Sequence, residues 1–196
     1  MEYLKVQSFG PIEKAEVNFG DLTLLVGPQA SGKSIFLQLL KLIVDKHSIM
    51  NTLQQYNYIW SENPKNILDI YFGEGMANVW KSNSEIRLNN KEYVKDYLLE
   101  SNPNDTPEML FYIPAQRILS ISDGRPKNFM EFDVSTPYVL RHFSEILRLY
   151  LQNDPGLTSS IFPVNHQLEG QIGRPLTTVF FTEGKLLWTK GQGKRR

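Results

Sequence analysis

The stretch LLVGPQASGKSIFLQLLK, residues 24–41, decides what kind of fold this sequence can adopt. An apolar run enters a loop of small residues, and apolar residues at helical spacing follow directly after it. Within the stretch, Gly27 to Ser34 match the pattern G-x-x-x-x-G-K-[ST] at every fixed position. Between a buried strand and an amphipathic helix, this pattern is typical of a loop that binds nucleotide phosphates.

The chemistry of phosphate binding explains the fixed residues of this loop. Gly27 and Gly32 let the backbone curl so that successive N–H groups point at phosphate oxygens. The Lys33 ammonium can reach the β- and γ-phosphates, and the Ser34 hydroxyl can ligate Mg²⁺. We therefore predict a catalytic role for Lys33 and a metal-binding role for Ser34. The residues predicted to contact ATP are Gly27, Pro28, Gln29, Ala30, Ser31, Gly32, Lys33, Ser34 and Ile35.

The composition is that of an ordinary globular protein. The 196 residues suffice for one domain, with 41% hydrophobic and 21% charged side chains. Lys and Arg number 21 and so do Asp and Glu, so no overall charge favours nucleic acid. The chain has no cysteine, which excludes disulfides, thiolate zinc sites and cysteine nucleophiles. Without a signal-peptide pattern or a membrane-length apolar run, we expect a cytoplasmic protein.

Residues 1–47 are predicted to form a strand meander, the phosphate loop and a helix. Apolar and polar residues alternate over 2–9 and again over 14–19, as in half-buried strands. Residues 22–27 are almost continuously apolar, which is typical of a strand buried on both faces. The helix begins near Ser34 and is predicted to end near a Lys-His pair.

A variable insert is predicted over 48–107. Its apolar runs indicate short strands over 67–73 and 77–90, the second ending in an Asn-Asn turn. Residues 91–101 have the pattern of a short helix, and a loop rich in Asn and Pro follows.

The remaining part, 108–196, completes what we predict to be a single, partial domain. It begins with a second buried strand over 108–114, which a proline ends. A Thr-Pro pair then starts a long helix over 136–154. The end of the chain reads as a hairpin with strands at 177–182 and 185–189 around a Glu-Gly turn.

Two segments resemble known P-loop ATPases. LKVQSFGPIEKAEVNFGDLTLLVGPQASGKS, residues 4–34, is similar to the opening of the RecF/SMC/OLD branch of the ABC-type ATPases. Gln29 takes a place in that pattern that is often filled by Asn. FYIPAQR, residues 111–117, resembles a Y-I-P-A-[EQ]-R segment of bacterial AAA-family ATPases. The apolar positions that match the opening pattern are Leu4, Val6, Phe9, Ile12, Val17 and Phe19. The resemblance implies an α/β P-loop NTPase fold, with this chain as the N-terminal lobe.

The same resemblance implies a role for Gln116. It corresponds to the glutamine of the Q-loop, which helps to hold Mg²⁺ and the attacking water, so we assign it a catalytic and metal-binding role. The alternative is a loop glutamine without a metal. Arg117 either contacts phosphate or pairs with a carboxylate such as Asp123.

Parts that hydrolysis requires are missing from these 196 residues. No run of four apolar residues followed by Asp-Glu, the Walker B strand, is found, and no S-G-[GE]-[QE] signature is found. We therefore expect the chain to be the front portion of a longer ATPase that binds Mg-ATP and does not hydrolyse it alone. Because parallel strands would lack neighbours, we also expect self-association or a separate C-terminal ATPase half.

Alternative functions stay open. A P-loop kinase needs an Arg-rich lid, for which 116–127 is the only candidate, and a degenerate phosphate loop could serve as a non-catalytic interaction module. DNA is a further candidate partner: Tyr56, Tyr58 and Trp60 could stack bases or anchor the insert. His142, which has no metal-ligand spacing, is predicted to be a surface or boundary residue of the helix over 136–154.

Overall fold

The computed structural model describes residues 1–60, 62–100, 107–122, 125–133, 135–152, 179–182 and 185–188. Its strands are β1 (Tyr3–Phe9), β2 (Ile12–Asn18), β3 (Trp80–Leu88), β4 (Lys91–Tyr93), β5 (Ile121–Ser122), β6 (Arg125–Pro126), β7 (Val179–Thr182) and β8 (Lys185–Trp188). Its α-helices are α1 (Lys33–Gln55), α2 (Pro64–Phe72) and α3 (Tyr138–Gln152). Short 3-10 helices are η1 (Lys95–Leu99), η2 (Arg117–Ser120) and η3 (Phe129–Glu131).

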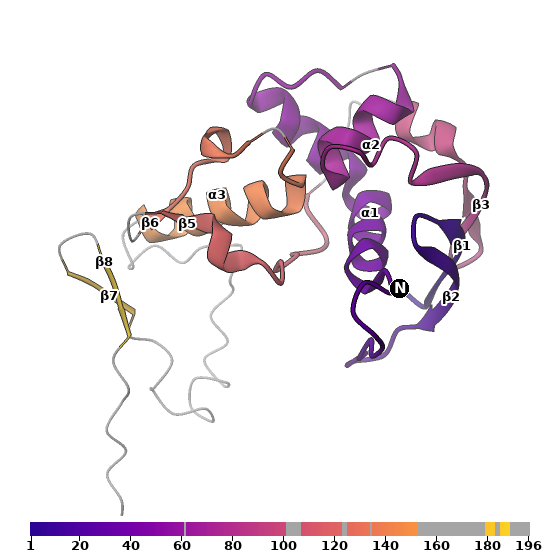
Figure 1. Ribbon diagram of the computed structural model, residues 1–196, viewed down its shortest axis with the longest axis horizontal. Helices are drawn as coiled ribbons and strands as arrows, with labels where there is room; N and C mark the ends of the chain where they lie inside the picture. Colours follow the sequence, from indigo (N-terminus) through magenta and orange to yellow (C-terminus); the bar gives the residue numbers. More distant parts are fainter. Residues whose placement is uncertain are drawn as a thin grey trace, which may run out of the picture.

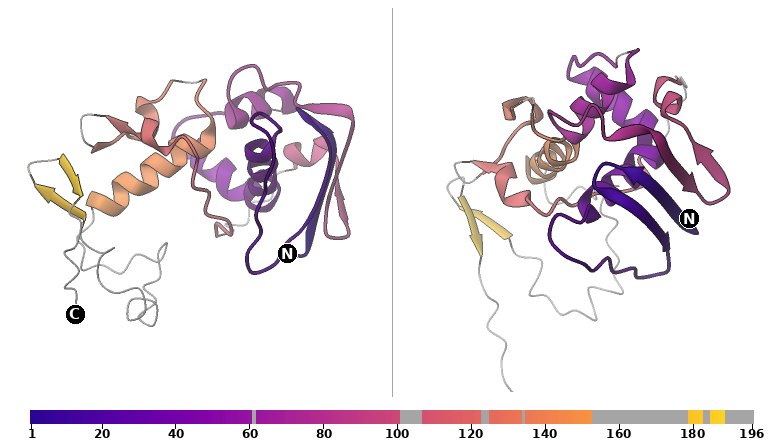
Figure 2. Two further views of the ribbon diagram at one scale, coloured as in Figure 1. Left: turned by 60° about the horizontal axis from the view of Figure 1, so that its bottom comes forward. Right: turned by 45° about the vertical axis from the view of Figure 1, so that its right-hand side comes forward.

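An antiparallel sheet in the order β2-β1-β3-β4 lies against one side of α1, and α3 lies on the other side beyond α2 (Figures 1 and 2). The first two predicted strands are confirmed and pair with each other, Leu4 opposite Val17. Leu4 and Val6 are buried because alternate side chains of β1 face the helices. A register shift next to Ser8, whose φ is 54°, brings Phe9 to the same buried face.

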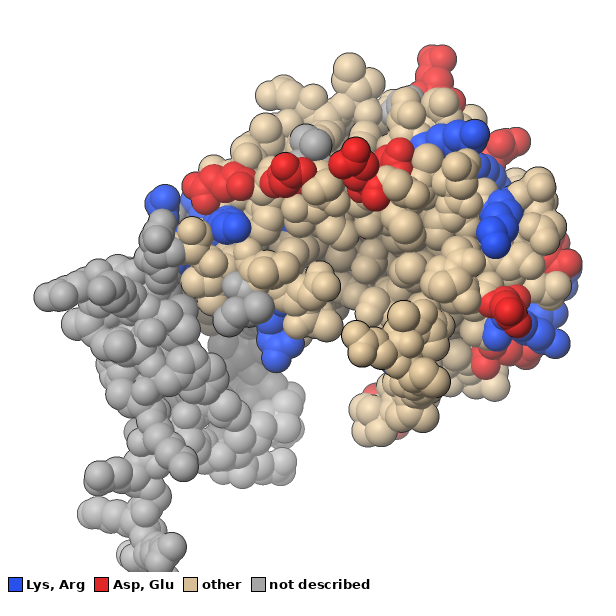
Figure 3. Space-filling model, in the orientation of Figure 1, with Lys and Arg blue, Asp and Glu red and all other residues tan. Residues whose placement is uncertain are grey.

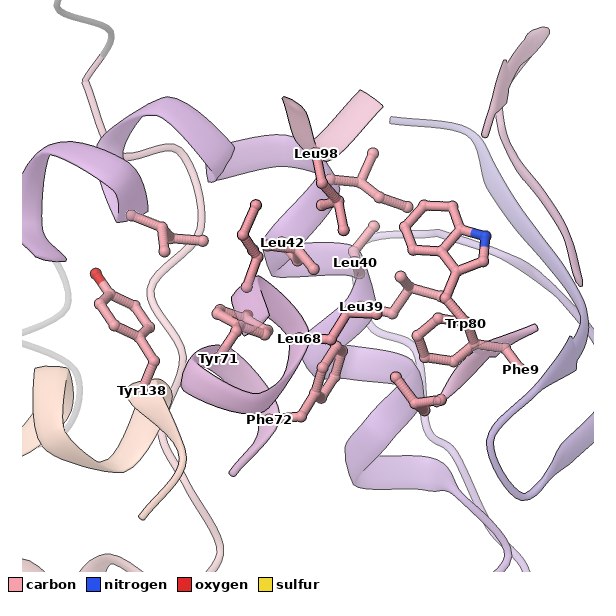
Figure 4. Packing of buried hydrophobic residues seen from close by; sticks show 14 of the residues in the cluster. Phe9, Leu39, Leu40, Leu42, Leu68, Tyr71, Phe72, Trp80, Leu98 and Tyr138 are labelled. Carbon is pink, nitrogen blue, oxygen red and sulfur yellow. The ribbon is translucent and has the colours of Figure 1, made fainter. Parts of the chain in front are cut away.

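The hydrophobic core fills the space between the sheet and the helices α1 and α2 (Figure 4). Phe9 is its link to the sheet, with ring centroids 5.8 Å from both Phe72 and Trp80. The core residues labelled in Figure 4 are Phe9, Leu39, Leu40, Leu42, Leu68, Tyr71, Phe72, Trp80, Leu98 and Tyr138. The packing sets the orientation of α1, the helix that directly follows the phosphate-loop pattern.

Helix α1 confirms the prediction of a helix after the loop and is longer than predicted. It continues through a kink at Asp45, where φ is −110° and ψ is 21°, to Gln55. Ile49 and Leu53 continue its buried face beyond the kink. The basic pair that suggested an end is overridden because those apolar residues pack in the core.

The strand predicted over 67–73 is wrong, because this segment forms α2. The Asn63 side chain caps the helix by accepting a hydrogen bond of 3.0 Å from the Lys65 N–H, and Pro64 occupies the first turn. A short apolar run does not distinguish a strand from a helix, whereas the Asn-Pro start signal does. The buried residues of α2 are Ile67, Leu68, Tyr71 and Phe72.

The helix predicted over 91–101 is replaced by β4 and η1. The strand predicted before it is confirmed as β3, and the Asn-Asn turn returns the chain so that β4 pairs with β3. Asn89 adopts a left-handed φ of 53° there, and its side chain accepts hydrogen bonds from the N–H groups of Glu2 and Tyr3. Pairing with β3 therefore outweighs the local helical pattern.

The two buried strands predicted over 22–27 and 108–114 are wrong as strands. Neither segment belongs to a sheet of the described residues, and each packs partly buried side chains, Leu25 and Leu110, against the core. Leu24 is 75% exposed and Val26 is 89% exposed, and Met109 is 72% exposed. A strand is stabilised by a hydrogen-bonded neighbour on its edge, and no described segment supplies one here.

Two predictions for the second half are confirmed. Helix α3 occupies the segment predicted as the long helix, and β7 and β8 form the predicted antiparallel hairpin, with Val179 opposite Trp188. The Glu-Gly turn of the hairpin lies outside the described residues. Among the described helices, none combines the length and the apolar character that crossing a bilayer requires.

Candidate functional site

The phosphate-loop pattern forms an exposed turn between the extended segment 22–27 and the start of α1. Residues 27–31 are all exposed, and Gly32 is buried. Ala30 adopts a left-handed φ of 62° and Gly32 one of 88°. The loop therefore presents its backbone to solvent and turns sharply before the helix begins.

Gly32 is required by both conformation and space. Its φ favours glycine, and a Cβ at this position would lie 2.7 Å from Cγ1 of Ile12 in β2. A larger residue would push the loop away from the sheet. Glycine here thus holds the start of α1 close to β2.

Lys33 folds back over the loop. Its Nζ donates hydrogen bonds of 2.9 Å to the Gly27 carbonyl, 2.5 Å to the Pro28 carbonyl and 3.0 Å to the Ser31 hydroxyl. All three partners are uncharged and exposed. Among the described residues, no carboxylate forms an ion pair with this ammonium. The Ser34 hydroxyl is exposed and forms no hydrogen bond with another described residue.

The first turn of α1 is suited to an anion. No acidic side chain lies in that turn, and Gly32 offers no side chain to cap it. The first helical hydrogen bond runs from the Phe36 N–H to the Gly32 carbonyl at 2.8 Å, so the N–H groups ahead of it have no helical partner. These donors, the positive end of the helix dipole and Lys33 match the chemistry of a phosphate group.

The start of α1 offers few protein ligands for Mg²⁺. The described residues contain no group of three acidic or histidine side chains that could hold a metal. Ser34 offers one hydroxyl ligand, and Mg²⁺ in nucleotide sites takes most of its ligands from phosphates and water. The donor set is therefore compatible with Mg²⁺ bound together with a nucleotide.

Gln116 is not joined to the loop within the described residues. It lies exposed in the turn before η2, where its carbonyl accepts a hydrogen bond of 2.9 Å from the Leu119 N–H. No hydrogen bond of the described residues links its side chain to 27–35. Arg117 is also exposed, and the Asp123 proposed to pair with it lies outside the described residues.

A largely buried ionic cluster, which the sequence patterns did not indicate, holds the segment leading to Gln116. Lys41 is 1% exposed and Asp45 is 3% exposed, and both contact the segment 108–110. His142 was predicted to be a surface or boundary residue and is instead buried, with Nε2 3.2 Å from both carboxylate oxygens of Glu108. A Lys and an Asp four residues apart resemble a solvated pair, so only their place on the apolar face of α1 signals burial.

Electrostatics within this cluster favour the charged carboxylate of Glu108. Burial alone raises the pKa of Glu108, but hydrogen bonds and charges from His142 and Lys41 outweigh it and lower the pKa to about 2. The buried carboxylate of Asp45 and the partly buried carboxylate of Glu108 therefore face one buried ammonium, with His142 as the fourth group.

The aromatic residues of the insert are used for packing. Tyr56 stacks on Phe129 with centroids 4.2 Å apart, and the Tyr58 hydroxyl accepts a hydrogen bond of 2.7 Å from Arg141. Trp60 donates to the Leu98 carbonyl at 2.9 Å. This supports anchoring rather than base stacking. On the face shown in Figure 3, the described surface is largely uncharged, with acidic side chains along its upper edge and no continuous basic patch.

Comparison with known protein families shows which family the chain belongs to. The profile of the AAA ATPase domain matches residues 1–121, which is more than half of the chain. The chain belongs to this family. The matched part of this AAA ATPase domain includes the phosphate loop, all of α1 and the segment through Gln116, and it ends before α3. Neither the curated proteins nor the solved structures contain a significant match to the chain. Membership of an AAA ATPase family implies nucleotide binding.

Proposed function

We propose that this chain is the ATP-binding N-terminal lobe of an ABC-type ATPase of the RecF/SMC/OLD kind. The observation that carries the proposal is the loop Gly27–Ser34 at the N-terminus of α1, with unpaired helix N–H groups and the Lys33 ammonium at one place. In this proposal the residues 27–35 cradle the phosphates of ATP. Ser34 binds Mg²⁺ together with phosphate oxygens.

Lys33 exchanges partners when ATP binds. Its hydrogen bonds to Pro28 and Ser31 join it to neutral, exposed groups. Phosphate oxygens carry charge and form stronger hydrogen bonds with an ammonium than carbonyls and hydroxyls do. The same exchange places the ammonium where charge develops on the γ-phosphate during transfer.

Hydrolysis by this site needs groups from another segment. The proposed Q-loop residue Gln116 supplies one contact to Mg²⁺ and water, and no Walker B pair is found in the sequence. We propose that a C-terminal ATPase half adds parallel strands beside the extended segments 22–27 and 108–114. Two observations support this proposal. Within the described residues, neither 22–27 nor 108–114 pairs with a strand, and the side chains of Leu24 and Val26 are exposed.

A titration tests the nucleotide site. We expect the chain to bind Mg-ATP without measurable steady-state turnover, and Lys33→Ala to weaken binding by about 10- to 100-fold, because charge-assisted hydrogen bonds are lost. Lys14→Ala, an exposed lysine on β2, is the matched control and should bind as the unsubstituted chain does. Absence of Mg-ATP binding would contradict the proposal as a whole. Turnover that Lys33→Ala abolishes would contradict the need for a second half.

Sedimentation tests the exposed strand-like edge. If 22–27 is a pairing edge, the purified chain should self-associate at micromolar concentration, and Leu24→Asp should shift it toward monomer. Ile59→Asp is the matched control, since Ile59 is 82% exposed and lies outside both extended segments. A chain that is monomeric before any substitution, and that also fails to bind a C-terminal ATPase half, would show that this edge needs no partner.

A further inference from the structure

A largely buried ionic cluster joins three parts of the fold that are far apart in the sequence. Lys41 and Asp45 come from α1, Glu108 from the extended segment 107–116, and His142 from α3. Nζ of Lys41 donates to Asp45 at 3.0 Å and also contacts the Glu108 carboxylate. The Lys41 side chain is 2% exposed and that of Asp45 is fully buried.

Within this cluster, Asp45 and Lys41 supply the hydrogen bonds that a neighbouring strand would otherwise provide. Oδ1 of Asp45 accepts from the Met109 N–H at 2.7 Å, and Oδ2 accepts from the Leu110 N–H at 2.9 Å. Nζ of Lys41 donates to the Leu110 carbonyl at 2.6 Å. These backbone groups are partly buried and take their partners from the two side chains, so these side chains determine where the segment crosses α1.

Glu108 extends the contact to α3. Both of its carboxylate oxygens lie 3.2 Å from Nε2 of His142. The His142 ring stacks on Tyr138 with centroids 5.1 Å apart, and Tyr138 stacks on Tyr71 of α2 at 5.6 Å. Burial raises the pKa of Tyr138 and of Tyr71, so both phenols stay neutral beside the cluster.

Charged side chains are an uncommon choice for such a contact. Apolar residues of similar size often stabilise a buried contact as well as an ion pair does, because desolvating the charges is unfavourable. The charged groups instead fix the relative positions of the elements, because each hydrogen bond here has a defined donor and acceptor. Helix α1 then connects the cluster rigidly to the phosphate loop, because Lys41 lies about 12 Å along the helix axis from Lys33.

We propose that Lys41, Asp45, Glu108 and His142 form a clamp that couples the phosphate-loop helix to the segment carrying Gln116 and to α3. The four are positioning residues. A shift of α1 when the loop binds phosphate passes through the clamp to this segment and to α3. The coupling of the clamp to nucleotide binding rests on the proposed function, whereas the contacts of the clamp can be tested without nucleotide.

Amide hydrogen exchange of the full chain, resolved by residue, tests the clamp without nucleotide. We expect the Met109 and Leu110 amides to be protected, and Asp45→Asn to increase their exchange at least 10-fold, because an amide offers one acceptor oxygen where the carboxylate offers two. Glu92→Gln, in the exposed pair with Arg87, is the control and should change these rates less than twofold. Equal protection of both amides in Asp45→Asn would overturn the clamp.

Coupling is tested with Glu108→Gln, which removes the charge of Glu108 and keeps Lys41 paired with Asp45. In the unsubstituted chain, Mg-ATP should change exchange in 107–116 and α3. In Glu108→Gln, the Kd for Mg-ATP should change less than threefold while the response of α3 falls at least threefold. An undiminished response of α3 would overturn the coupling. If Mg-ATP does not bind the unsubstituted chain, the proposed function fails, and the exchange of Met109 and Leu110 alone decides the clamp.

Discussion

Lys33 at the start of α1 and Lys41 about two turns later form opposite kinds of contact. Lys33 makes three hydrogen bonds to uncharged, exposed groups of its own loop, including the Gly27 carbonyl. Lys41 also makes three, but two of its partners are carboxylates, that of Asp45 fully buried and that of Glu108 partly buried. Lys33 can exchange its exposed, neutral partners for a phosphate. Lys41 cannot leave its carboxylate partners, because unpaired charges would then remain out of contact with water. One helix thus begins with a lysine that we propose to bind phosphate and continues with a structural one.

The largest effect is expected at the buried lysine. Lys41→Met leaves Asp45 and Glu108 without their shared cation, so we predict a loss of about 3–5 kcal/mol in the free energy of unfolding. Denaturant unfolding measures it. Arg87→Met, in an exposed pair with 51% and 54% side-chain exposure, should change stability by less than about 1 kcal/mol. Equal losses for the two variants would remove the contrast between buried and exposed pairs.

Acid should weaken the same cluster. The folded-state pKa of Glu108, about 2, lies below its ordinary value of 4.5, so its ion pairs stabilise the fold above about pH 4.5. That contribution, at most about 3 kcal/mol, disappears as the pH falls from 4.5 toward 2. The stability difference between the unsubstituted chain and Glu108→Gln should therefore shrink over this range. A difference that stays constant down to pH 2 would contradict the lowered pKa.

A smaller gain is expected in the loop. Ala30 adopts a left-handed φ of 62°, which is unfavourable for a residue with a Cβ. Ala30→Gly removes that strain but makes the unfolded chain more flexible, so the free energy of unfolding should rise by only about 0.5–1 kcal/mol. Thermal unfolding measures the change. A loss of stability would indicate that the Ala30 methyl makes a favourable contact.

The smallest effect on stability is expected at Lys33, the lysine of the loop. Lys33→Ala should change the free energy of unfolding by less than about 0.5 kcal/mol, because the carbonyls that it leaves are open to water. The same variant should lose most of its affinity for Mg-ATP. A large loss of stability would place Lys33 with Lys41 among the structural groups.

Local signals were sufficient for the elements whose stabilising contacts are close in sequence. The strands β1 and β2 follow from alternation and a short turn, and α1 and α3 follow from helical spacing. The phosphate loop follows from Gly32, Lys33 and their spacing, because the loop geometry depends on the backbone preferences of a few adjacent residues. Even α2, which was misread, carries a local Asn-Pro start signal.

Contacts between distant residues decided the rest. Apolar content predicted strands over 22–27 and 108–114, but a strand needs a neighbour that hydrogen-bonds to it, and composition does not say whether one is present. Nor does it show that the backbone at Met109 and Leu110 bonds to Asp45, or that His142 is buried against Glu108. A charged side chain can be buried only where it has partners, and these can be far away in the sequence. Leu110, whose N–H donates to Asp45, lies 65 residues from it. The sequence by itself therefore determined the phosphate loop and its helix, and only the tertiary structure decided which charged residues of that helix are buried.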